Sequence, residues 1–341
     1  MACDGGRQTG NGAVGAETQP RVAVLILNWN GIRDTLETLE SVIKLQYANA
    51  EIVVVDNGST DRSSEVIATT FPTVHLIVSP ENLGVAGGRN LGLQTVLRRP
   101  EIDYVLFLDN DVTAGPTLLD ALVAAAEARP EIGIVGPIVY YQDDPQRIRS
   151  DGVAIVFREV TAKSPAKDRL ENGNRPEGIK RVDAINGCCM LIKRQVFEAV
   201  GCFNPAYFML NDETDFCYRA GERGFRSAVV THAALWHKVS ASTRGEYTPG
   251  RAYYTGRCTI LFLKEHGRVW HWVSTLTCVV LSLPIAYLRE RRRGNQHAVV
   301  MKFRGYRDGL LGRPIDPEVE RYFQRGPADS ADEGARARRN A

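Results

Sequence analysis

Short apolar runs and segments with helical spacing alternate along the first half of the chain. The apolar runs have the length of buried strands, and the segments between them repeat apolar side chains every three or four positions. Buried strands separated by helices are typical of parallel β-α-β units, in which helices cover both faces of the sheet. We therefore predict an α/β fold with a Rossmann-like, mostly parallel central sheet. Strands are expected at residues 22–27, 52–55, 74–78, 104–108 and 132–139, and helices at residues 35–45, 63–69, 87–97 and 116–129.

The second half of the chain has fewer clean β-α-β units. Residues 143–182 are rich in arginine, proline, glycine and charge, which favours an elaborated loop or a small β excursion. An apolar run at residues 184–192 and a strand-like run that ends at Trp236 and His237 follow it. We expect these runs to add a mixed edge to the same sheet.

Polar residues follow three of the predicted strands. Asn28 and Asn30 come after the first strand, Asp56 after the second, and Asp109 directly after the run at residues 104–108. Parallel sheets bind their ligands beyond the carboxyl ends of the strands. Each of these residues alone also suits a turn, but three such strand ends on one edge predict a ligand site.

Asp109 and Asp111 are two carboxylates, separated by Asn110, at the end of a very apolar run. Hard oxygen ligands suit Mg²⁺ or Mn²⁺, and a site with few protein ligands leaves positions for phosphate oxygens. His237 also ends an apolar run and offers an imidazole as a third ligand. The alternatives are a helix cap for one aspartate and a structural role for the histidine.

Asp212, Glu213 and Asp215 place three carboxylates close together. If a helix starts at about Thr214, the acids lie at its N-terminus, where negative charge is favourable, and this is a purely structural explanation. The functional alternative is that one carboxylate accepts the proton of an attacking hydroxyl. Beside a metal and a pyrophosphate, one member of the pair would have a raised pKa and make a better base.

The glycine-rich segment at residues 82–92 allows the backbone to approach a ligand closely before a helix begins. Asn82, Gly84 and Arg89 are its candidate ligand-binding residues. The chain lacks G-x-G-x-x-G after its first strand and has no Walker lysine motif, so a dehydrogenase or a P-loop enzyme is a poor match.

The composition argues against some classes of protein but does not identify the function. Apolar residues make up 44% and charged residues 24% of the 341 residues, and the net charge of +2 is too small for a nucleic-acid binder. The seven cysteines form no C-x-x-C pair, so neither a zinc site nor a disulfide framework is expected. Residues 1–20 and 326–341 are polar and rich in small residues, and we predict a disordered leader and tail.

These features together resemble the family 2 glycosyltransferases, which are inverting enzymes with the GT-A fold. The resemblance covers roughly residues 21–264, which we expect to form the catalytic domain. It rests on an ordered set of motifs, namely VAVLILNWNG, EIVVVDNGSTD, NLGVAGGRNLG, LFLDNDV, INGCCMLIKRQVFEAVGCF, NDETDFCYRAGERGFR and LWHKVSAS. Within the family, the chain is most similar to rhamnosyltransferase-like members that build bacterial surface polysaccharides.

The resemblance implies a role for several of these residues. Asp56 would hydrogen-bond the nucleotide base, and Asp61 and Arg89 would lie near the nucleotide. We expect the other strand-end and glycine-rich positions to line the same nucleotide-sugar site, together with Asp109. Those positions are Asn28, Asn30, Asn82, Gly84 and Asn110.

The implied metal and catalytic residues come from the later motifs. Asp109 and Asp111 correspond to the metal and diphosphate motif, with Asp111 as the direct ligand of Mg²⁺ or Mn²⁺, and His237 helps to hold the metal or the diphosphate. The family usually has Glu-Asp where this chain has Asp212-Glu213, and its second acid is the base. Glu213 is therefore the predicted base, with Asp212 as the alternative.

The resemblance implies transfer of a sugar from a dTDP- or UDP-linked donor to a hydroxyl of a glycan or lipid-linked glycan, with inversion at the anomeric carbon. A sugar-phosphate nucleotidyltransferase is the first alternative, but its glycine-rich loop after the first strand is replaced here by Asn28-Trp29-Asn30-Gly31. A non-catalytic scaffold that binds nucleotide sugars is the second, and the retained acids and His237 argue against it.

Residues 265–325 are expected to be helical and membrane-associated. No side chain between Arg268 and Arg289 carries a formal charge, a length close to a bilayer span, but serines, threonines and a proline dilute its hydrophobicity. Tryptophans at one end and arginines at the other favour a helix that lies in the interface of the anionic cytoplasmic leaflet. We predict peripheral association with the inner face of the plasma membrane. A helix packed on the catalytic domain and a full span are the alternatives.

Overall fold

The computed structural model describes residues 19–157, 162–171, 177–238, 247–316 and 319, and the predicted disordered leader and tail lie outside this part of the chain except for residues 19 and 20. The predicted alternation of strands and helices in the first half is confirmed, with element ends shifted by a few residues. The strands are β1 (Val22–Asn28), β2 (Ala50–Asp56), β3 (His75–Val78) and β4 (Tyr104–Asp109). The helices are α1 (Ile32–Val42), α2 (Ser63–Thr70), α3 (Gly84–Leu97) and α4 (Leu118–Glu127).

The second half of the chain completes the same sheet. Its strands are β5 (Val112–Ala114), β6 (Ile132–Tyr141), β7 (Ile148–Ser150), β10 (Ile179–Val182), β11 (Cys189–Lys193) and β12 (Arg226–His237), and its helices are α5 (Arg194–Val200) and α6 (Asp212–Glu222). The predicted β excursion also contains a separate hairpin of β8 (Ala154–Ile155) and β9 (Ala162–Lys163).

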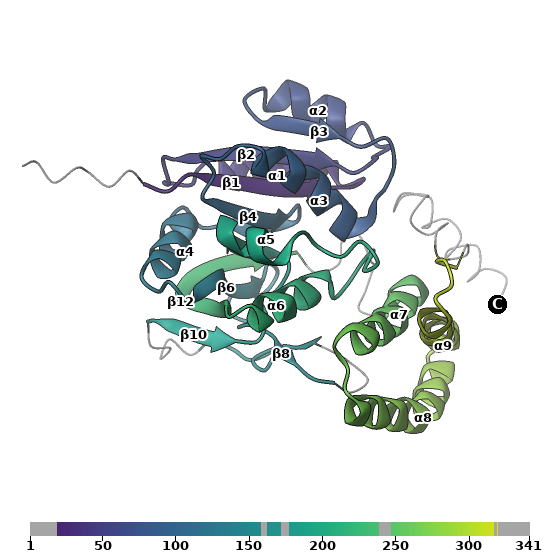
Figure 1. Ribbon diagram of the computed structural model, residues 1–341. Helices are drawn as coiled ribbons and strands as arrows, with labels where there is room; N and C mark the ends of the chain where they lie inside the picture. The colour runs from purple at the N-terminus through teal and green to yellow at the C-terminus, as the bar shows by residue number, and fades with distance from the viewer. Residues whose placement is uncertain (1–18, 158–161, 172–176, 239–246, 317–318, 320–341) are drawn as a thin grey trace, which may run out of the picture.

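The ten-stranded sheet is parallel on one side and mixed on the other (Figure 1). The strand order is β10-β12-β6-β11-β4-β1-β2-β3, and β4, β1, β2 and β3 run parallel as predicted. The antiparallel strand β11 lies inside the sheet, between β4 and β6, and not at its edge. The long excursion before β11 explains this, since it gives the chain room to reverse direction without a crossover helix.

Alternate residues of each central strand enter two different hydrophobic layers, as a sheet covered on both faces requires. Val24 and Ile26 of β1 pack with the apolar side chains of α1, α2 and α4. Leu25 of the same strand packs on the other face with those of α3, α5 and α6. The α/β architecture with helices on both faces is therefore confirmed.

A short antiparallel pair brings two distant segments together at the carboxyl edge of the sheet. β5 follows the Asp109–Asp111 turn directly and pairs with the last residues of β12, so that Val112 lies opposite His237. The amide of Lys238 donates to the carbonyl oxygen of Asp111 at 2.9 Å. Backbone pairing thus fixes the histidine beside the aspartates.

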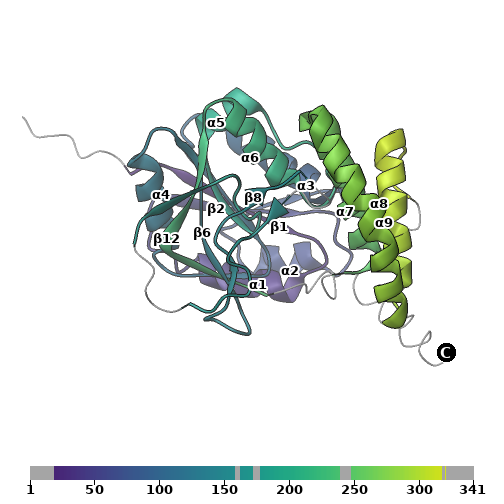
Figure 2. The same cartoon turned by 90° about the horizontal axis from the view of Figure 1, so that it is seen from below.

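Three further helices lie together at one end of the molecule, with α7 nearest the rest of the protein (Figures 1 and 2). They are α7 (Pro249–His266), α8 (Val269–Arg292) and α9 (Gln296–Leu311). α7 and α9 approach so closely that a Cβ atom added to Gly305 would lie 2.0 Å from the carbonyl oxygen of Tyr253. The predicted boundary at residues 264 and 265 falls in the last turn of α7, and the division into domains stays a prediction.

α8 leaves most of its apolar surface uncovered. Val279, with Trp272 and Leu283, packs in one cluster with side chains of α7 and α9. Val280, Leu281 and Ile285 are each about two-thirds exposed, at 68%, 65% and 68%. By its length and composition α8 would be able to cross a membrane. It therefore forms neither a fully packed core helix nor a charged surface helix.

Candidate active site

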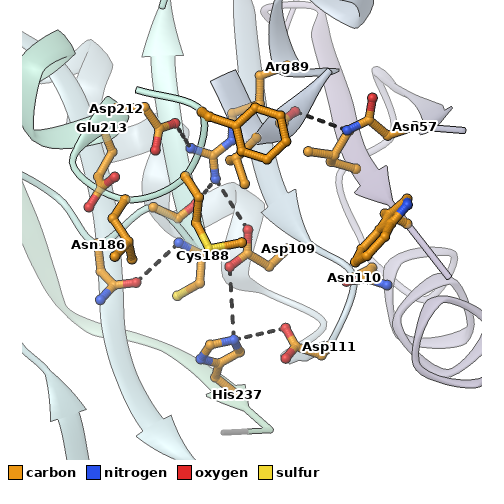
Figure 3. A pocket seen from close by; sticks show the side chains of 18 of the residues that line it. Asn57, Arg89, Asp109, Asn110, Asp111, Asn186, Cys188, Asp212, Glu213 and His237 are labelled. Carbon is orange, nitrogen blue, oxygen red and sulfur yellow. Dashed lines mark hydrogen bonds and ion pairs between the residues drawn. The ribbon is translucent and has the colours of Figure 1, made fainter. Parts of the chain in front are cut away.

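A pocket of about 300 Å³ opens at the carboxyl edge of the sheet, where the strand-end pattern places a ligand site. Residues from β4, α3, α6 and the end of β12 converge on it (Figure 3). The predicted site residues that line it are Asn82, Gly84, Arg89, Asp109, Asn110, Asp111, Asp212, Glu213 and His237.

Asp109, Asp111 and His237 present their ligand atoms to one point of the pocket, within 4.8 Å of one another. His237 Nε2 lies 2.8 Å from Asp111 Oδ1 and 3.9 Å from Asp109 Oδ2. The histidine is buried, whereas the Asp109 side chain is 36% exposed and faces the pocket. Desolvation inside the pocket raises the pKa of Asp109, Arg89 opposes the rise, and the Asp111 carboxylate adds to it.

This donor set fits a divalent cation. Two carboxylates with one imidazole suit Mg²⁺ or Mn²⁺, and adjacent ligands of an octahedral ion stand about 3 Å apart, close to the shorter of the two separations. His237 Nδ1 is buried and has no hydrogen-bond partner among the described residues. The set is open on the side of the pocket, where phosphate oxygens would complete the coordination.

Arg89 joins the two acidic halves of the pocket. Its side chain is 5% exposed, Nη1 donates to Asp212 Oδ2 at 2.8 Å, and Nη2 donates to Asp109 Oδ1 at 3.2 Å. Nη2 also donates to the carbonyl oxygen of Gly187 at 2.7 Å, and the guanidinium lies over the rings of Phe107 and Phe203. Arg89 thus lines the pocket as a bridge between carboxylates.

The two acids at the start of α6, Asp212 and Glu213, have different surroundings. Asp212 is 2% exposed and its carboxylate is bound by Arg89, whereas Glu213 faces the pocket with no ion pair among the described residues. Burial raises the pKa of Glu213 to about 8, and the neighbouring Asp212 carboxylate contributes to the rise. Glu213 is therefore the member that is free to exchange a proton near neutral pH.

Four predicted nucleotide-binding residues do not line the pocket. Asn28 and Asp56 are buried, with Asn28 Nδ2 donating to Asp56 Oδ2 at 3.1 Å. Asn30 Oδ1 accepts from the amide of Thr60, and Asp61 Oδ2 accepts from the amide of Ile32 at 3.2 Å. They form a hydrogen-bonded network that shapes the loops after β1 and β2, and their contact with a nucleotide stays a prediction.

The glycine-rich segment does approach the pocket with its backbone. Gly84 has φ +73° and lines the pocket, and a Cβ atom there would lie 2.5 Å from the carbonyl oxygen of Phe208. Asn82 Oδ1 accepts from the Gly84 amide at 2.9 Å and from Asn57 Nδ2 at 3.0 Å. A glycine is needed here both for its backbone angle and for the space.

Several pocket residues were not predicted from the sequence. Trp29 and Asn57 each follow a predicted strand-end residue, Asn28 and Asp56. Asn186 belongs to one of the family motifs. The sequence therefore contained a signal for these three residues. Others lie in irregular segments, on a very short strand or in the first turn of α7, where hydrophobic spacing gives no information about a site. They are Arg149, Phe208, Met209, Leu210 and Arg251.

Known proteins resemble this chain in sequence. The model of the family described as glycosyl transferase family 2 matches residues 23–201, just over half of the chain. An N-acetylglucosaminyl-diphospho-decaprenol L-rhamnosyltransferase of Mycobacterium tuberculosis is 29% identical over 250 residues, which cover 66% of this chain and 78% of that protein. The O-antigen chain rhamnosyltransferase WbaN of Salmonella anatum is 24% identical over 199 residues, covering 58% and 59% of the two chains.

Solved structures resemble it in fold. The mannosyltransferase PcManGT from Pyrobaculum calidifontis, in complex with GDP-Man and Mn²⁺, has a TM-score of 0.53 at 16% identity and covers 87% of this chain and 89% of its own. GalNAc-T7 with UDP, GalNAc and Mn²⁺ has a TM-score of 0.57 at 18% identity, covering 73% and 48%. With the family model over more than half of its length and this fold, the chain belongs to glycosyl transferase family 2 and has the GT-A architecture.

Proposed function

We propose that this protein is an inverting, metal-dependent glycosyltransferase that moves rhamnose from a dTDP- or UDP-linked donor to a hydroxyl of a lipid-linked glycan. Membership in family 2 supports sugar transfer in glycan biosynthesis. The names of two relatives supply rhamnose as the sugar, and the name of the mycobacterial relative supplies a diphospho-lipid acceptor. We base both on similarity of sequence.

One observation carries the proposed reaction, namely that Glu213 and the metal-ligand set face the same pocket from different sides (Figure 3). Inversion requires the base and the leaving group on opposite sides of the anomeric carbon. Glu213 would accept the proton of the acceptor hydroxyl as that oxygen attacks. The diphosphate would leave toward Asp111 and His237.

Glu213 and the metal-ligand set would have different roles in this reaction. With its pKa raised to about 8, Glu213 is a stronger base than an ordinary carboxylate and still ionises near physiological pH. Asp109, Asp111 and His237 would hold the cation, as Mn²⁺ is present in the two solved relatives. A bound Mg²⁺ or Mn²⁺ would neutralise the charge that develops on the departing diphosphate.

The C-terminal helices support a membrane location for the proposed acceptor. The exposed apolar side chains of α8 continue onto α9, where Phe303 is 58% and Leu311 57% exposed. Such a surface needs a partner that excludes water. Four arginines at residues 289–293, with the single acid Glu290 among them, add positive charge at one end, which suits anionic lipids. We place the protein on the cytoplasmic face of the plasma membrane, with α8 in the interface.

Loss of the central metal ligand should abolish transfer. Asp111→Asn keeps the side-chain shape but removes the negative charge that binds the cation, so sugar transfer and Mn²⁺ binding should both be lost. Asp144→Asn is the control, because Asp144 pairs with Arg147 outside the pocket. The measurement is release of nucleoside diphosphate with Mn²⁺ and after addition of EDTA. Full activity of the chelated wild type would contradict the metal role.

Glu213 should make the protein less stable as the pH rises. Its pKa is about 8 when folded and near 4.5 when unfolded, so the folded state holds the extra proton between these values and loses stability across that window. Glu213→Gln cannot ionise and should therefore gain stability over the wild type from about pH 5 to about pH 9, measured by urea unfolding. The exposed Glu40→Gln should show no such gain. Parallel pH curves for Glu213→Gln and the wild type would refute the raised pKa.

The apolar surface of α8 should bind anionic vesicles. Leu281→Glu with Ile285→Glu should weaken flotation with phosphatidylcholine–phosphatidylglycerol vesicles by roughly tenfold or more, because two exposed apolar side chains would no longer gain free energy by entering the bilayer interface. Ile43→Glu with Val78→Glu, also exposed but far along the chain, is the matched control. Salt should release the wild type from the vesicles. A wild type that never floats would contradict membrane binding, and release by detergent alone would indicate a span.

A further inference from the structure

Arg149 lines the pocket, and no described residue forms an ion pair with it. Its Nε is buried and donates no hydrogen bond to any group in the described part of the chain. Arg89, in contrast, is bound by Asp212 and Asp109. Among the described residues no ion pair joins Arg149 to a carboxylate of the pocket, although four carboxylates line it.

The backbone holds Arg149 in place from both sides. β7 pairs with β6, and the flanking residues Ile148 and Ser150 are 2% and 1% exposed. The amide of Ile148 donates to the carbonyl oxygen of Arg169 at 2.8 Å. The backbone position of Arg149 is therefore set by the sheet.

Strand pairing puts Arg149 near the metal-ligand set. β7 pairs with the end of β6, and that end pairs on its other side with the last residues of β12, including His237. The charge of Arg149 also acts on the buried Cys188 thiol, lowering a pKa that burial and Asp109 raise. The carbonyl oxygen of Cys188 accepts from the Asp109 amide at 3.0 Å.

A cation with a buried, unsatisfied nitrogen costs free energy in the ligand-free protein. An anionic ligand would remove that cost, and a guanidinium matches the geometry of phosphate oxygens. We propose that Arg149 binds the diphosphate of the nucleotide-sugar donor, an assignment that rests on the proposed function. The donor is favoured over the phosphates of a lipid-linked acceptor because Arg149 lines the same pocket as Asp109, and because β6 joins its strand to the strand that ends at His237.

Bound there, Arg149 assists the departure of the diphosphate. The bond between the anomeric carbon and the diphosphate oxygen breaks, and its electron pair stays on that oxygen. The acceptor oxygen forms the new bond and gives its proton to Glu213. Arg149 stabilises the negative charge gained by the leaving group, in addition to a cation held by Asp109, Asp111 and His237.

The test is binding of UDP, UMP, dTDP and dTMP, each with MnCl₂, by isothermal titration calorimetry. Arg149→Met should weaken binding of the diphosphates by roughly 10- to 100-fold, since a charged hydrogen-bonded contact is lost, and binding of the monophosphates less. Arg149→Lys should recover part of the loss. Arg147→Met is the matched control, because Arg147 lies two residues away and pairs with Asp144 outside the pocket.

The outcomes separate this assignment from the proposed function. Diphosphate binding by Arg149→Met equal to that of the wild type would overturn the assignment alone, and a raised KM for a lipid-diphosphate acceptor only would move Arg149 to the acceptor. A wild type that binds none of the four nucleotides would overturn both. The ligand-free Arg149→Met should unfold at the wild-type temperature or above it, and a lower temperature would indicate a structural role instead.

Discussion

The buried guanidinium of Arg89 fixes the two sides of the pocket relative to each other. Arg89 reaches from α3 to Asp212 at the start of α6 and to Asp109 at the end of β4, which are more than one hundred residues apart in the chain. Removal of one partner from such a group leaves an uncompensated charge and typically costs about 3–5 kcal/mol. The placement of the proposed base and that of the proposed metal ligands therefore depend on the same ion pairs. Because Arg89 engages Asp212, the second acid Glu213 is left to face the pocket.

The rest of the site is built around this charge by backbone pairing. The β5–β12 pair carries His237 to Asp111, and the wall opposite the sheet is supported by the C-terminal helices. Phe208 stacks on Tyr254 of α7 with ring centroids 5.5 Å apart, and Cys258 Sγ donates to the carbonyl oxygen of Met209 at 3.3 Å. The helices that we propose to lie on the membrane thus also back the pocket, which would bring a lipid-linked acceptor close to the base.

The sequence predicts the parallel half of the sheet because each strand is a continuous apolar run between amphipathic helices. It also predicts which residues lie at the carboxyl edge, because parallel strands end there together, as Asp109 and Asp111 do. It does not predict the ion pairs of Arg89, which depend on how α3 and α6 approach each other in space. Arg149 carries no signal either, since a three-residue strand has no periodicity to interpret. Asp56 ends a strand, yet its carboxylate accepts hydrogen bonds from Asn28 Nδ2 and the Ser59 amide inside a loop network.

The most direct test of the account is a single-turnover comparison of Glu213→Gln with Asp212→Asn, at saturating donor and with Mn²⁺ present. Glu213→Gln removes only the proton acceptor, so it should bind the donor normally and slow transfer by a factor on the order of 10²–10⁴. Asp212→Asn weakens an ion pair of Arg89 and should reduce the rate less, with a loss of stability. The reverse ranking, with Asp212→Asn the slower enzyme and Glu213→Gln close to the wild type, would show that Asp212 is the base and contradict the account.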